Sequence, residues 1–228
     1  MQGNKVLDLV SSHAATATFL TEKIYKHIFS EKPPAAVLVR ARAAWVANDG
    51  KPGQITQVLR AILLDGSEIG DGPRTKVRRP YERMIALARV TDAQVEPDPL
   101  YTDILNAVTD TPFGWATPDG RPDDNKFWLN TSTNIGVWNQ LLYVTYSTYI
   151  SIDYLTQTPL DIQKSAILTT EYWVGRMIGY RLSDEAMAAL ATAVARLFEG
   201  YSSSPFYREA FGTKFISQLA TAPEFVYH

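Results

Sequence analysis

The side chains with the clearest chemical potential lie in one segment, 111–130, which reads TPFGWATPDGRPDDNKFWLN. Its carboxylates Asp119, Asp123 and Asp124 offer the oxygen ligands that calcium prefers. Their spacing does not follow the EF-hand pattern, and aspartates in PDG and PDD turns commonly accept hydrogen bonds from their own backbone. The segment therefore predicts a turn-rich loop, with a calcium-stabilised loop as an alternative and no other cofactor expected.

Aromatic residues of the same segment suggest a second chemistry. Trp115 and Trp128 could stack on sugar rings, and paired carboxylates such as Asp119 and Asp123 perform glycoside hydrolysis. The separation of the two carboxyl groups cannot be obtained from sequence, and large aromatic rings more often anchor a loop to a core. A carbohydrate-binding or hydrolytic protein, with Asp119 and Asp123 as its catalytic candidates, is therefore an alternative function.

A basic run before the next predicted helix offers a partner for this loop. Arg78 and Arg79 precede Pro80, which suits the first position of a helix. Either arginine could clamp Asp119 or Asp123 through charge-assisted hydrogen bonds. We therefore predict a docked loop. The complete set of predicted binding residues is Trp115, Asp119, Asp123, Asp124, Trp128, Arg78 and Arg79.

Helices must position these side chains, because apolar residues recur with helical spacing and no period-two alternation is sustained. The chain is predicted to be all-α, an irregular helical bundle of about eight to ten helices with one long structured loop at 111–130. We expect one helical domain, 1–228, with a subdomain boundary near 66–79. The predicted helices cover about 12–29, 34–47, 55–66, 80–90, 98–108, 131–152, 160–180, 184–200 and 205–221.

Three N-cap positions indicate where helices begin, and one aromatic helix indicates which side chains are buried. Helices are expected to begin at Ser12, at Asn130 or Thr131, and at Ser183, because these residues carry the side chains that N-caps prefer. The helix after Asn130 is rich in Trp and Tyr at helical spacing, which is typical of a core face. We therefore expect Trp138 and its Tyr neighbours in the core, with exposure of some Tyr side chains to solvent or a partner chain as the alternative. Asn139 and Gln140 are the candidates for a buried polar anchor.

Composition restricts the function classes. The 22 basic and 24 acidic residues nearly balance, which disfavours nucleic-acid binding. The chain contains no cysteine, so disulfides, thiolate catalysis and iron–sulfur clusters are excluded. No uncharged apolar run approaches the roughly 18 residues that a membrane span requires, and the N-terminus lacks the pattern of a signal peptide. We therefore predict no membrane span.

Several segments, taken in order, resemble an uncharacterised bacterial family known as domain of unknown function 1800. The resemblance implies a mostly helical, often exported protein about twice this length, of which the chain is the C-terminal half. Periplasmic or secreted localisation follows from it. Ala14 and Val137 depart from the family pattern, which commonly has Pro and Arg there. The matching segments are 6–28, KPP at 32–34, 61–69, KVRRPYER at 76–83, 112–130, WNQ at 138–140 and APEF at 222–225.

These observations together predict a non-catalytic helical interaction or scaffold module. Its expected partner is another protein or the missing N-terminal half of its own family architecture. The sequence does not predict an oligomeric state.

Overall fold

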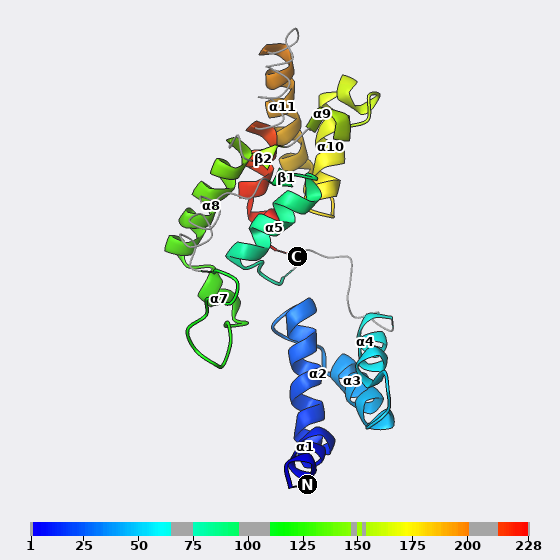
Figure 1. Ribbon diagram of the computed structural model, residues 1–228. Coiled ribbons are helices and arrows are strands. Elements are labelled where there is room, and N and C mark those ends of the chain that lie inside the picture. The colour runs from blue at the N-terminus through cyan, green and yellow to red at the C-terminus, as the bar shows by residue number, and fades with distance from the viewer. Residues whose placement is uncertain are drawn as a thin grey trace. The chain divides into compact units, whose positions relative to one another are not determined.

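The computed structural model describes residues 2–64, 75–95, 110–146, 150–151, 154–200 and 214–227. The fold is all-α, as predicted (Figure 1). The chain divides into two compact units, one formed by Met1–Lys76 with Asp123–Asn125 and the other by Val77–Pro122 with Lys126–His228. The change from the first unit to the second, between Lys76 and Val77, falls within the predicted boundary range 66–79. Residues 66–74 of that range lie outside the described part.

The first unit is built from helices α1 (Gln2–Ser12), α2 (Ala14–Ile28), α3 (Ala35–Ala47) and α4 (Gln54–Leu63). Its core consists of Ala17, Thr21, Tyr25, Val37, Ala41, Trp45, Val58 and Ile62. The predicted cap at Ser12 is wrong, because α1 continues through that residue. His13 caps α2 instead, with its Nδ1 accepting the Ala15 N–H at 3.1 Å.

The second unit contains most of the remaining elements. Its long helices are α5 (Pro80–Val90), α8 (Thr131–Tyr146), α10 (Ala166–Met177) and α11 (Asp184–Gly200), followed by a helix at 214–221. The short helices are α7 (Asn125–Trp128), α9 (Tyr154–Gln157), η1 (Ile162–Lys164) and η2 (Pro223–Val226). The first residue of α7, Asn125, belongs to the first unit. One two-residue antiparallel pair, β1 (Gln94–Val95) with β2 (Ile150–Ser151), was not predicted.

The core of the second unit gathers apolar side chains from α5, α8, α10, α11 and the 214–221 helix. Trp173 of α10 lies at its centre and packs edge-on against Tyr154 and Tyr172. The Trp173 indole N–H donates to the Thr158 hydroxyl at 3.0 Å, so the one polar group of this buried side chain has a hydrogen-bond partner. The largest fully buried side chains include Met84, Leu87, Leu141, Trp173, Phe215, Ile216, Leu219 and Phe225.

Helix α8 corrects the prediction for the aromatic stripe. Its core face consists of Val137, Leu141 and Val144, which recur at i, i+4 and i+7. Trp138 and Tyr143 stay 38% and 40% exposed, because one helix face alone can turn toward the core. Of the two predicted buried anchors, Asn139 is likewise exposed and Gln140 is half-buried.

Other predicted elements differ in their bounds. The helix expected at 160–180 begins later, because Ser165 caps α10 and accepts the Leu168 N–H at 3.3 Å. The helix expected at 98–108 lies outside the described residues, as does the first part of the one expected at 205–221. Within the residues that the structure describes, no helix combines the length and apolar character needed to cross a membrane.

Candidate functional site

Two residues fix the loop that precedes α7. Asp110 is buried, and its Oδ2 accepts the Tyr81 N–H in the first turn of α5 at 3.0 Å. Arg121 brings its Nε within 2.6 Å of Asp110 Oδ1, and its Nη2 donates to the Thr111 carbonyl. The two ends of segment 110–121 are therefore joined to each other and to α5.

The electrostatics of this ion pair are dominated by burial. Burial raises the pKa of Asp110, while the Tyr81 N–H and the Arg121 guanidinium act in the opposite direction. Removing a carboxylate from water costs free energy even when the carboxylate is paired with a cation. Asp110 therefore depends on the Tyr81 N–H and on Arg121 to hold its charge inside the protein.

The predicted clamp of Arg78 or Arg79 on Asp119 or Asp123 is wrong, because the two arginines have other partners. Arg78 Nη1 donates to the Phe225 carbonyl at 2.8 Å, and its guanidinium carbon lies 4.8 Å from the centre of the Phe225 ring. Arg79 donates from Nε to Glu82 at 2.9 Å. Glu82 is the nearer partner because it stands at the third position of α5, where it also accepts the Arg79 backbone N–H at 2.7 Å.

The two tryptophans of the loop serve as anchors. Trp128 is buried, and its indole N–H donates to the Pro122 carbonyl at 2.7 Å. Trp115 packs beside it, with ring centres 6.2 Å apart, and donates to the Thr117 hydroxyl at 3.0 Å. Because Thr117 in turn donates to the Asp119 carboxylate, the polar groups of this turn are engaged locally.

The acidic residues do not form one described site. Asp123 and Asp124 belong to the first unit, where Asp123 lies 3.9 Å from Lys76 Nζ, whereas Asp119 belongs to the second. Among the described residues, no three His, Cys, Asp or Glu side chains gather as a metal-binding group. A site that combines the three aspartates remains a prediction.

Calcium can be tested directly. We expect millimolar calcium to leave the melting temperature unchanged, because Asp119 is engaged by Thr117 and Asp123 faces Lys76. Differential scanning fluorimetry with a magnesium control measures this. A melting temperature that rises with free calcium alone would instead support the calcium-stabilised loop, since a ligand that binds the folded state raises its stability.

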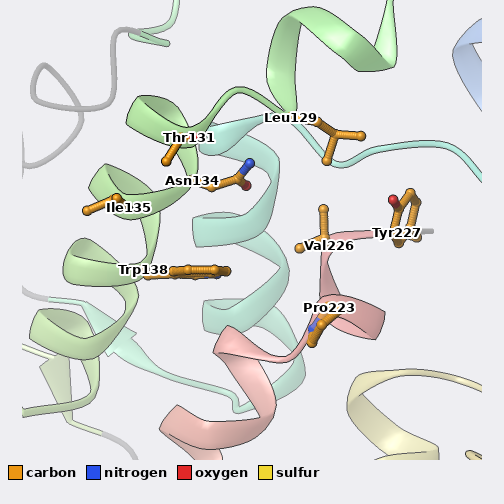
Figure 2. A pocket seen from close by; sticks show the side chains of 8 residues that line it. All are labelled: Leu129, Thr131, Asn134, Ile135, Trp138, Pro223, Val226 and Tyr227. Atoms are coloured by element: carbon orange, nitrogen blue, oxygen red, sulfur yellow. The ribbon is translucent and has the colours of Figure 1, made fainter.

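A pocket of about 270 Å³ opens between α8 and η2, and we call it the α8–η2 pocket. Figure 2 shows Trp138 projecting from α8 toward Val226 and Pro223 on the other wall. Trp138 keeps its exposed surface there because it forms one side of the opening. The pocket is lined by Leu129, Thr131, Asn134, Ile135, Trp138, Pro223, Val226 and Tyr227.

An arginine lies behind one wall of this pocket. Arg83 of α5 is 0% exposed; its Nε donates to the Arg78 carbonyl at 2.8 Å and its Nη1 donates to Asn134 Oδ1 at 2.7 Å. Its Nη2 is buried with no hydrogen-bond partner among the described residues. Burial lowers the pKa of Arg83 to about 10, with the nearby Arg78 guanidinium acting in the same direction. At neutral pH the side chain is therefore a buried cation.

Sequence reasoning missed Arg83, although a signal existed. Residue 83 shares a helix face with Pro80, Met84 and Leu87, all buried in α5. A charged residue on an apolar helix face is a buried-charge candidate.

Segments that carried the family resemblance meet at this pocket. KVRRPYER supplies Arg83, the 112–130 segment supplies Leu129, WNQ supplies Trp138 and APEF supplies Pro223. The fold is thus all-α, with the mainly apolar α8–η2 pocket beside the buried Arg83.

A family model described as "protein of unknown function (DUF1800)" matches residues 1–227. The chain belongs to this family. Neither the comparison with curated proteins nor the comparison with solved structures finds a match. Val137, one of the two residues that depart from the expected family pattern, is fully buried in the core of the second unit.

Proposed function

We propose that this chain is a non-catalytic helical interaction module that binds a protein partner through α1. The observation that carries this proposal is the solvent exposure of the apolar side of α1. Val6, Leu7, Leu9 and Val10 are 55–68% exposed. Val6, Leu9 and Val10 follow the i, i+3, i+4 spacing with which a helix lays one face into an apolar groove.

The charge of α1 favours a protein groove over a lipid surface. Lys5 and Asp8 are its charged residues and cancel each other. A helix that lies on a membrane typically carries a polar face rich in Lys and Arg, which attracts anionic lipid. The partner that fits α1 is therefore an apolar groove on another protein or on the N-terminal half of the family architecture.

The carbohydrate-binding alternative receives less support from the loop geometry. Trp128 is buried, Trp115 packs its ring beside Phe127 and Trp128, and neither tryptophan lines the α8–η2 pocket. Free stacking faces beside paired carboxylates are what that function requires. The exposed apolar side of α1 therefore supports an interaction module more strongly than the loop supports carbohydrate binding.

Site-specific photo-crosslinking tests the α1 surface. A benzophenone amino acid placed at Leu9 should give a discrete protein adduct in producing cells, whereas the same group at Asp8, on the opposite face, should give none. Val6→Lys should reduce the Leu9 adduct about tenfold, because a charge in a desolvated contact costs more than ~1.4 kcal/mol.

The matched control is Ser11→Lys, which adds the same charge to the polar face of α1 and should leave the adduct unchanged. Circular dichroism of each purified variant confirms that the helices are retained. Equal adducts at Leu9 and Asp8, or a Leu9 adduct insensitive to Val6→Lys, would contradict the proposal.

A further inference from the structure

We propose that the α8–η2 pocket binds a small carboxylic acid with an apolar body, such as an arylacetate, and that Asn134, which is oriented by Arg83, recognises its carboxylate end. This inference concerns the second unit and is independent of the α1 interface.

The apolar body of the ligand matches the pocket walls. Leu129, Ile135, Trp138, Pro223 and Val226 supply most of the lining. The volume of about 270 Å³ lies near the lower end of the roughly 300–1,000 Å³ typical of small-molecule pockets. One aromatic ring with a short side chain is the size of ligand that such a pocket holds.

The polar end of the pocket is preorganised by Arg83. Because Arg83 Nη1 donates to Asn134 Oδ1, the amide of Asn134 must direct its Nδ2 hydrogens away from the guanidinium. One Nδ2 hydrogen reaches the Asn130 carbonyl at 3.1 Å, and an amide nitrogen carries a second one. Thr131 and Tyr227 add hydroxyl donors to the same lining. Arg83 thus acts as a positioning residue.

Charge selects a carboxylate over a neutral ligand. Arg83 is a fully buried cation whose Nη2 has no hydrogen-bond partner among the residues that the structure describes. The nearby carboxylate of Glu82 is already engaged by Arg79 at 2.7 Å. The adjacent N-terminus of α8 adds a partial positive charge of its own. A bound anion would offset part of the desolvation cost of the buried Arg83 charge.

The decisive comparison uses phenylacetate and its neutral isostere phenylacetamide. Both are titrated into the full chain, and binding is followed through tryptophan fluorescence, because Trp138 lines the pocket. Phenylacetate should bind in the millimolar range and at least about tenfold more tightly than phenylacetamide. Equal affinities, or no phenylacetate binding up to tens of millimolar, would overturn the proposal.

A matched pair of variants separates this site from non-specific binding. Asn134→Asp places a carboxylate beside Arg83, so it should raise the melting temperature and abolish phenylacetate binding. Asn139→Asp makes the same change at an exposed position of α8 and should alter neither property. Trp138→Ala, at a partly exposed residue, should remove binding while the protein stays folded. Retained phenylacetate binding in Asn134→Asp or Trp138→Ala would contradict the assignment.

Discussion

Replacing Arg121 with methionine should destabilise the second unit by about 3 kcal/mol. The variant removes the cation that lies 2.6 Å from Asp110 and leaves that carboxylate buried without its ion-pair partner. Breaking one partner of a buried ion pair typically costs about 3–5 kcal/mol. Urea denaturation followed by tryptophan fluorescence measures the effect, because four of the five tryptophans belong to the second unit.

The pH dependence of this variant has a defined sign. Burial raises the pKa of Asp110 already in the natural protein, and loss of Arg121 should raise it further. The folded variant then holds the Asp110 proton more tightly than the unfolded chain, so its stability deficit should be largest at neutral pH. The deficit should shrink as the pH falls through the raised pKa.

Arg181→Met is the matched control for Arg121→Met. Arg181 pairs with Asp184 at 2.8 Å, and both side chains are largely exposed. Surface pairs contribute little, so this variant should stay within about 0.5 kcal/mol of the natural protein. Equal effects of the two arginine substitutions would show that the Asp110 pair does not hold the loop.

Phe225→Ala should be the second large loss, about 4 kcal/mol in the stability of the second unit. Phe225 is fully buried in η2, where Arg78 stacks on its ring. Truncating a buried phenylalanine typically costs about 3–5 kcal/mol, because a cavity remains. The same change should release η2 and with it one wall of the α8–η2 pocket.

An exposed phenylalanine of the same unit provides the comparison for Phe225→Ala. Phe113 is fully exposed, and Phe113→Ala should leave the urea midpoint unchanged. Urea denaturation reports both variants under identical conditions. A Phe225→Ala midpoint indistinguishable from that of Phe113→Ala would mean that η2 is not anchored by this ring.

Local rules predicted the helices well where caps are encoded in neighbouring residues. Asn130 accepts the Thr133 N–H at 2.9 Å, and Ser183 accepts the Ala186 N–H at 3.2 Å, so both predicted caps are confirmed. Pro80 opens α5 as expected. These contacts span three residues or fewer, which is the range that sequence patterns describe.

The 111–130 segment shows where local rules stop. Its turns were predicted, yet a single helical turn, α7, occupies Asn125–Trp128 within a stretch expected to be free of helix. Loop position depends on Asp110, which lies one residue before the segment and contacts Tyr81 across 29 residues of chain. Nothing in the turn sequence itself encodes that distant contact.

The pocket was beyond sequence reasoning for the same reason. The Arg83–Asn134 bond joins residues 51 apart, and the Arg78–Phe225 bond joins residues 147 apart. Helical periodicity indicates which face is buried and leaves the partner of a buried charge undetermined. The basic run therefore suggested a clamp on Asp119 or Asp123, whereas in the fold Arg78 binds the Phe225 carbonyl.

A double-mutant cycle on Asp110 and Arg121 tests most directly whether the loop is a fixed part of the second unit. The free energies of unfolding are measured for the natural chain, Asp110→Asn, Arg121→Met and the double variant. The ion pair seen in the structure predicts a coupling free energy of at least about 1.5 kcal/mol. Additive single effects, with no coupling, would contradict it.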